Sequence, residues 1–336
     1  MSASFPVDPA SPWRLCVAPM LDWSDRHCRG LHRLFSPHAR LYTEMVTTGA
    51  LLHGDVERHL AFDPAEHPIA LQLGGSDPAE LAQAARLGAQ YGYDEINLNC
   101  GCPSERVQRG SFGVCLMREP TLVADCVRAM REAVDLPVTV KHRVGIDRDE
   151  SYSFVRDFVG VVHEAGCEVF LVHARNAWLH GLSPKENREV PPLRHEVALR
   201  LRADFPRARM VLNGGIDSVD SARKALGGVE GVMMGRAIYQ EPLLLARLEE
   251  ALFGGPPVPE LGEAIERASA YLERAVARGH LPWAVIRHAL GLVRDVPGAR
   301  IWRRSLSDPR FVARAGGGAL RAAAAAAFEL RTAPTP

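Results

Sequence analysis

One cysteine has surroundings that favour chemistry over packing. Cys102 lies in the turn Gly101-Cys102-Pro103, which leaves its thiol little helix or strand to pack into. Such a thiol can act as a nucleophile or as a proton donor. No histidine and asparagine stand at the spacing of a papain-like protease, which disfavours that class. A buried structural cysteine is the alternative, and it is our interpretation of Cys100 and Cys16.

A second pattern combines glycines with cations and suits a phosphate. Asn213-Gly214-Gly215 and Gly235-Arg236 each follow a short apolar run. Glycines near a helix N-terminus expose backbone N–H groups that can bind phosphate, and Arg236 adds a positive charge. Turn glycines are common, so neither segment is specific alone. Lys141 and His173 also end apolar runs and favour a phosphate-bearing cofactor, although Lys141 could instead form a structural salt bridge.

Eight apolar runs must position these residues. They are continuous, not alternating, which is typical of strands buried on both faces of a parallel sheet. Helix-like segments separate them, and several open on Ser, Asp or Thr, a helix-start signal. The pattern predicts a (β/α)8 TIM barrel, with a doubly wound sheet as the alternative. The predicted strands are 14–18, 41–46, 68–73, 94–98, 137–141, 168–173, 209–213 and 230–234, and predicted helices include 78–91, 121–134, 151–165 and 218–226.

Polar or glycine residues follow nearly every predicted strand at the same end. Active sites of TIM barrels lie at the C-terminal ends of the strands, in the loops that follow them. We therefore expect Cys102, Lys141, His173 and the two glycine segments to meet at one mouth. This regularity favours the barrel over the doubly wound sheet.

A Gly/Pro linker at residues 253–259 divides the chain. We place a TIM-barrel domain at 1–253 and a small all-helical domain at 254–336. After residue 280 there are nine arginines and three acidic residues, a net charge of +6, so the first 280 residues carry 31 basic and 37 acidic residues, a net of −6. A basic end on an acidic body suits contact with phosphate, and a solvated helical face is the alternative.

Composition narrows the remaining classes. No apolar run reaches the roughly 20 residues that span a bilayer, and the first residues lack the regions of a signal peptide. Seven cysteines, an odd number, indicate reduced thiols in the cytoplasm. The C-x-C spacing of Cys100 and Cys102 is poor for zinc, so we expect no metal site. We also expect a monomer.

Several segments together match a known family between about residues 14 and 310. They are Ala18-Pro19-Met20, Asn97 to Ser104 and on to Gly113, Lys141-His142-Arg143, His173-Ala174-Arg175, Asn213-Gly214-Gly215 and Met234-Gly235-Arg236. This set resembles the tRNA-dihydrouridine synthases. Residues 179–188 and 297–304 resemble the bacterial A-type branch, which acts on uridine 20/20a.

The resemblance implies reduction of a D-loop uridine in tRNA, with bound FMN and with NADPH as electron donor. Uracil would receive a hydride at C6 from reduced FMN and a proton at C5 from Cys102. The target base would be turned out of the folded tRNA. The implied cofactor-binding residues are Ala18, Pro19, Met20, Gln72, Lys141, His173, Asn213, Gly214, Gly215, Gly235 and Arg236. The implied tRNA-binding residues are Asn99, Lys185, Arg188, Arg300, Arg303 and Arg304.

Two other classes stay open on the residues alone. A small-molecule FMN barrel such as a dihydroorotate dehydrogenase shares the phosphate site but needs no basic helical domain. An RNA-binding protein on an inactive barrel needs no complete set of cofactor residues. Binding of tRNA discriminates the first from the predicted enzyme, and bound flavin discriminates the second.

Overall fold

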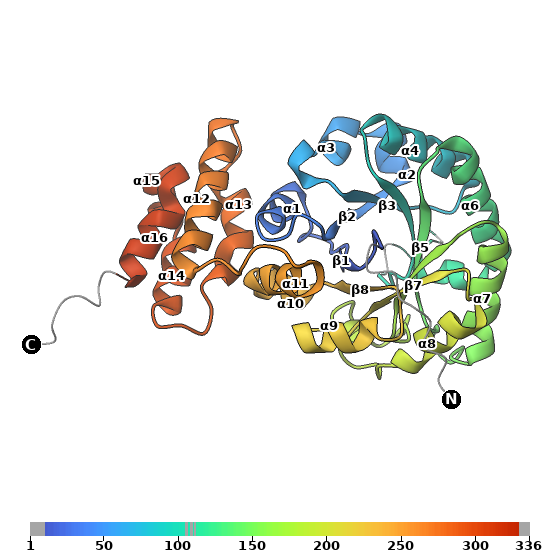
Figure 1. Ribbon diagram of the computed structural model, residues 1–336. Helices are drawn as coiled ribbons and strands as arrows, with labels where there is room; N and C mark the ends of the chain where they lie inside the picture. The colour runs from blue at the N-terminus through green and yellow to red at the C-terminus, as the bar shows by residue number, and fades with distance from the viewer. Residues whose placement is uncertain (1–10, 105–106, 108–109, 111, 329–336) are drawn as a thin grey trace, which may run out of the picture. The chain divides into compact units, whose positions relative to one another are not determined.

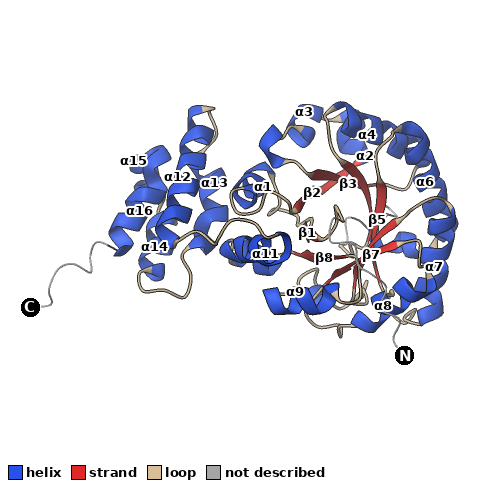
Figure 2. Cartoon of the chain, viewed as in Figure 1, coloured by secondary structure: helices blue, strands red, loops and turns tan. Residues whose placement is uncertain are grey.

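Eight parallel strands close into a barrel in the order β1 to β8 (Figures 1 and 2). The computed structural model describes residues 11–104, 107, 110 and 112–328. Each predicted strand is present to within two residues at either end, so the TIM barrel is confirmed and the doubly wound sheet is excluded. The strands are β1 (Leu15–Val17), β2 (Arg40–Thr47), β3 (Ile69–Gly74), β4 (Glu95–Cys100), β5 (Val138–Arg143), β6 (Val169–His173), β7 (Arg209–Asn213) and β8 (Gly231–Met234).

Helices surround these strands (Figure 2). Several of the helices begin at a capping side chain. Asp77 accepts hydrogen bonds from the backbone N–H groups of Ala79 and Glu80, and Ser151 and Ser218 cap their helices similarly. These caps confirm three of the predicted helix starts, whereas the helix predicted from residue 121 begins at Pro120 and has no side-chain cap. The helical elements that the structure describes in this unit are α2 (Thr48–His53), α3 (Val56–Leu60), η1 (Pro64–Glu66), α4 (Pro78–Gln90), η2 (Gly113–Arg118), α6 (Pro120–Ala133), α7 (Tyr152–Glu164), η3 (Glu186–Arg188), α8 (His195–Asp204) and α9 (Val219–Leu226).

The barrel interior is filled, not hollow. A buried cluster comprises Trp13, Cys16, Ala18, Tyr42, Ala70, Val169, Leu171, Val211 and Met233. Cys16 and Cys100 are both fully buried, which confirms their interpretation as packing residues. Such filling is typical of the fold and restricts chemistry to the mouth at the C-terminal ends of the strands.

A second compact unit combines residues 23–38 with the chain from Gly235 onward. Every described element of it is helical, as predicted for the C-terminal domain. It begins earlier than residue 254, since α10 and α11 pack within it, and it also takes α1 from between β1 and β2. Its elements are α1 (Arg26–Arg33), α10 (Arg236–Gln240), α11 (Leu243–Phe253), α12 (Leu261–Ala277), α13 (Pro282–Ala289), η4 (Leu290–Leu292), α14 (Ala299–Leu306), α15 (Pro309–Ala315), η5 (Gly316–Gly318) and α16 (Ala319–Phe328).

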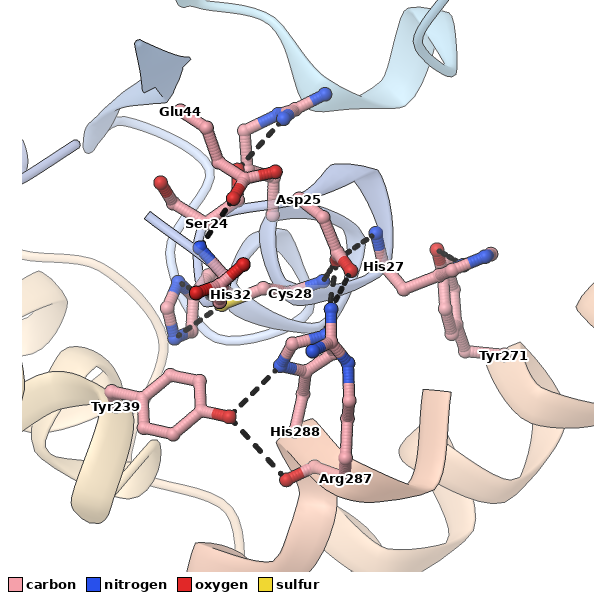
Figure 3. A network of polar contacts seen from close by, with 12 residues as sticks. Ser24, Asp25, His27, Cys28, His32, Glu44, Tyr239, Tyr271, Arg287 and His288 are labelled. Carbon is pink, nitrogen blue, oxygen red and sulfur yellow. Dashed lines mark hydrogen bonds and ion pairs between the residues drawn. The ribbon is translucent and has the colours of Figure 1, made fainter. Parts of the chain in front are cut away.

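One carboxylate explains why α1 belongs to this unit (Figure 3). Asp25 caps α1 by accepting from the N–H groups of His27 and Cys28, both at 2.9 Å. The same carboxylate pairs with Arg287 and His288 of α13, the latter at 3.0 Å. Burial alone raises the pKa of Asp25, but the hydrogen bond and charge of His288 outweigh it and hold that pKa well below its usual range. The cap and the ion pair therefore share one group.

Within residues 11–104, 107, 110 and 112–328, no helix has the length and apolarity needed to cross a membrane. The same residues contain no group of three or more His, Cys, Asp or Glu side chains placed to hold a metal ion.

Candidate functional site

Strand β4 supplies polar side chains to the barrel interior. Asn97 and Asn99 are two residues apart, so both face the same side of the strand. Gln72 of β3 joins them: its Nε2 donates to Asn97 Oδ1 at 2.7 Å, and its Oε1 accepts from Asn99 Nδ2 at 2.9 Å. Gln72, a predicted cofactor-binding residue, is therefore in direct contact with Asn99, a predicted tRNA-binding residue.

The loop after β4 presents Cys102 at the mouth. Asn99 Oδ1 accepts from the backbone N–H groups of Gly101 at 3.1 Å and Cys102 at 3.0 Å. The Cys102 carbonyl accepts from Val114 N at 3.1 Å. Gly113, with φ of 63°, lies so close that a Cβ there would be 2.8 Å from the same carbonyl oxygen. The thiol is partly exposed, and the backbone on both sides of it is fixed by hydrogen bonds.

Lys141 lies beside this loop, in register with Asn99 on the neighbouring strand. No carboxylate among the described residues pairs with its ammonium, so these residues do not bear out the salt-bridge alternative. Burial, followed by the nearby charge of Arg143, lowers the pKa of Lys141 to about 7. An unpaired amine in this position is available to a ligand.

Arg143 belongs to a segment that resembles the family, but no role was predicted for it. It is nearly fully buried, and its guanidinium donates to the backbone oxygens of Gly101 at 3.0 Å, Asn176 at 2.9 Å and Asn187 at 2.8 Å. It thus joins the loop after β4 to the segment after β6. A charged residue ending a buried strand was the available signal, but its three partners are distant in sequence.

The ends of β6 and β7 form the other side of the mouth. His173 is partly buried, and burial first, then the charges of Arg143, Lys141, Arg175 and Arg188, hold its pKa well below its usual range. The imidazole is therefore neutral near pH 7. The three arginines and the partly protonated Lys141 create a positive potential that favours an anionic ligand.

Gly214 and Gly215 adopt left-handed φ values of 108° and 70°. A Cβ at Gly214 would lie 2.9 Å from His173 Cδ2, so only glycine lets the backbone approach the ring this closely. No described residue accepts a hydrogen bond from either glycine N–H. The Asn213 side chain donates to Met233 O at 2.8 Å and so braces the strand end.

The remaining predicted cofactor residues follow β1 and β8. Ala18 N donates to Met234 O at 2.8 Å, and Met20 packs partly buried against the barrel core. Pro19 is also partly buried. Gly235 and Arg236 directly follow β8, at the N-cap and first residue of α10, and belong to the second unit.

These features fit a cofactor that has a phosphate and a flat apolar ring. Two uncommitted N–H groups, a neutral imidazole and an unpaired amine within a positive potential suit the phosphate and polar parts. Small and apolar side chains at Ala18, Pro19 and Met20 suit one face of a ring.

The predicted tRNA residues occur in two places. Lys185 and Arg188 are exposed at either end of the short turn η3, whereas Asn187 between them is buried. Arg300, Arg303 and Arg304 are exposed on α14, whose Trp302 and Leu306 are buried. No described acidic residue pairs with these three arginines, unlike Arg287, Arg294 and Arg321.

Comparison with known proteins identifies the family. A model described as Dihydrouridine synthase (Dus) matches residues 16–328. A tRNA-dihydrouridine(20/20a) synthase of Pseudomonas aeruginosa is 57% identical over 296 residues, covering 88% of this chain and 89% of the relative. One of Vibrio parahaemolyticus is 55% identical over 297 residues, covering 88% of this chain and 91% of the relative.

Among solved structures, a complex of 2-naphthoyl-CoA reductase aligns with a TM-score of 0.55 and 12% identity. The alignment covers 72% of this chain and 50% of that chain, and it shows a shared fold alone. The sequence relatives and the family model identify the family of this chain. This chain belongs to the dihydrouridine synthase family, whose members are flavin-dependent enzymes that reduce uridine to dihydrouridine in tRNA.

Proposed function

We propose that this protein reduces D-loop uridine in tRNA, at positions 20 and 20a, with bound FMN and with NADPH as the electron donor. The positions come from the names of relatives at about 55% identity over most of the chain. The observation that carries the proposal is the partly exposed Cys102 thiol, held in the same mouth as Lys141, His173 and the left-handed glycines.

The residues divide the work by their chemistry. The N–H groups of Gly214 and Gly215 and the neutral His173 would donate to the phosphate. Arg236, which the resemblance also assigns to the cofactor, follows β8 as the first residue of α10. Lys141 and Gln72 would meet the polar edge of the flavin ring, which Pro19 and Met20 would flank. When bound, reduced FMN supplies the hydride that uracil receives at C6.

Cys102 would supply the proton that uracil needs at C5. A thiol S–H can act as a general acid. Asn99 fixes the Cys102 backbone by accepting its N–H, so the same residue would position the acid and contact the base. Lys185, Arg188 and the α14 arginines would bind the tRNA backbone.

The charges on α14 favour this enzyme over a small-molecule FMN reductase. Exposed arginines without acidic partners are of little use to an enzyme whose substrate is a small ring, but they suit a polyanion. We further propose that the enzyme is a cytoplasmic monomer: its substrate is tRNA, and none of its seven cysteines forms a disulfide within the described residues.

The test uses the purified full-length protein. We expect about one FMN per chain, identified by mass spectrometry after heat release. With NADPH and tRNA from a strain lacking the gene, dihydrouridine should form at positions 20 and 20a. NADH, and tRNA that already carries the modification, serve as controls. A protein that cannot be reconstituted with FMN, or that forms no dihydrouridine, refutes the proposal.

A further inference from the structure

A continuous chain of buried hydrogen bonds runs through the barrel from the start of β4 to its end. Glu95, fully buried at the start, accepts from Thr139 Oγ1 of β5 at 2.5 Å. Thr139 Oγ1 accepts from Asn97 Nδ2 at 2.8 Å, and Asn97 Oδ1 accepts from Gln72 Nε2 at 2.7 Å. Gln72 Oε1 then accepts from Asn99 Nδ2 at 2.9 Å. All five residues are buried.

The groups at the two ends of this hydrogen-bond chain each have a fixed role, as acceptor at one end and as donor at the other. At one end, burial raises the pKa of Glu95, but Arg40 at 3.3 Å and the hydrogen bonds from Thr139, Trp13 Nε1 at 2.7 Å and Tyr42 Oη at 2.8 Å favour its ionised form. In that form the carboxylate only accepts. At the other end the backbone N–H groups that bond Asn99 Oδ1 only donate.

The groups between these ends can each donate and accept, so the ends fix their direction. Thr139 donates its only hydroxyl proton to Glu95, so its hydroxyl oxygen can only accept a hydrogen bond from Asn97. Asn97 therefore turns its amide nitrogen to Thr139 and its oxygen to Gln72. The same logic passes through Gln72 and leaves Asn99 with its oxygen toward the Cys102 loop. Low dielectric inside the barrel makes any reversed, unpaired amide costly.

We propose that Thr139, Asn97 and Glu95 are positioning residues that set the orientation of Asn99 and thereby hold the Cys102 loop in its catalytic conformation. The role of Cys102 in this statement rests on the proposed function. The hydrogen-bond relay itself does not, and it can be measured without any reaction.

The experiment compares two variants that each remove one hydroxyl from the same carboxylate oxygen. Thr139→Val deletes the hydroxyl inside the chain, and Tyr42→Phe deletes one outside it. Both take one donor from Glu95 Oε1, so both should lower thermal stability. Thr139→Ser keeps the hydroxyl and should restore the behaviour of the unaltered protein.

Hydrogen exchange at the Gly101 and Cys102 amides gives the first measurement. We expect exchange about tenfold faster in Thr139→Val, roughly the effect of losing one hydrogen bond of ordinary strength. Tyr42→Phe and Thr139→Ser should leave these two amides protected. If Thr139→Val does not fold, Glu95→Gln is the second variant to measure. Its side-chain amide can donate to Thr139 and so reverse the direction of every hydrogen bond in the hydrogen-bond chain.

Flavin reoxidation by tRNA in a single turnover gives the second measurement. It should fall about tenfold in Thr139→Val and remain within about twofold in Tyr42→Phe. If Thr139→Val and Tyr42→Phe had equal effects on hydrogen exchange and on flavin reoxidation, the hydrogen-bond chain would only stabilise the barrel. That result would overturn the inference. Faster exchange in a protein that forms no dihydrouridine would instead support the relay and refute the proposed function.

Discussion

At the scale of single residues, two thiols at the end of β4 differ in their access to a substrate. Cys100 is fully buried, and burial raises its pKa well above the usual value. Cys102 is partly exposed at the mouth. We expect Cys102→Ala to retain FMN and its reduction by NADPH, but to lower uridine reduction by roughly 10²- to 10⁴-fold, as expected for loss of a general acid.

Cys100→Ala is the matched control for this prediction. It removes a sulfur two residues away from a packed interior, so a modest loss of thermal stability should accompany nearly normal turnover. Stopped-flow measurement of flavin reduction and of its reoxidation by tRNA separates the two steps. Comparable losses of reoxidation in both variants would contradict the assignment to Cys102.

Lys141 makes a residue-scale prediction about pH. Its pKa in the folded protein is about 7, below the usual value of 10.5, so the folded state loses this proton first as pH rises. The stability of flavin-free protein should therefore increase between about pH 7 and pH 10 through this group. Lys141→Met should be relatively more stable below pH 7, and its advantage should shrink above it.

Chemical denaturation of flavin-free protein at about pH 6, 8 and 9.5 measures this difference. The same variant should bind FMN more weakly, since it lacks the cation for the ring edge. A stability difference that stays constant across this range would show that Lys141 does not titrate there.

At the scale of elements, α14 presents the arginines that best suit a polyanion. Arg300 and Arg304 are four residues apart and Arg303 lies next to them, so they share one exposed side while Trp302 is buried. The triple Arg→Ala variant should bind tRNA more weakly regardless of its sequence. The slope of the logarithm of tRNA affinity against the logarithm of salt concentration should become shallower by about one unit for each phosphate that the variant no longer neutralises.

Arg294 and Arg321 provide the control, because both already pair with acidic residues. Their replacement by alanine should affect tRNA binding less. Binding measured across a salt series, with FMN content and NADPH oxidation unchanged, checks the prediction. Unaltered affinity and slope in the triple variant would place tRNA recognition on the segment around Lys185 and Arg188.

At the scale of the whole chain, one ion pair joins segments 262 residues apart, Asp25 and Arg287. Asp25→Asn keeps a side chain able to cap α1 but removes the charge that meets α13. We expect a stability loss of about 1–3 kcal/mol, because a partly buried cation loses its partner. Asp25→Ala should cost more, since the cap is lost too.

The low pKa of Asp25 gives this prediction a pH dependence. Its contribution is complete above about pH 4 and is lost as pH falls below that value, where the unfolded chain takes up the proton first. Thermal unfolding at pH 3, 4 and 6 should therefore show the Asn variant converging on the unaltered protein at low pH. Parallel curves would show that the pair is not the cause.

The sequence by itself determined the barrel and the end at which its site lies. Continuous apolar runs mark strands buried on both faces, and capping residues mark helix starts; both signals are local. Because parallel strands all end at one mouth, Cys102, Lys141 and His173 could be placed there from their positions after the runs alone. The observed strand ends differ from the predicted ends by no more than two residues, because the apolar runs that mark the strands are local signals.

Only the tertiary structure decided which groups meet. Segment α1 follows a barrel strand and was therefore expected in the barrel domain, yet Asp25 places it with helices far along the chain. The order Glu95, Thr139, Asn97, Gln72, Asn99 likewise depends on the register of three strands, which pairs Gln72 with Asn97 and Asn97 with Thr139. Register and long-range ion pairs depend on packing between distant segments, and no local pattern of residues encodes them.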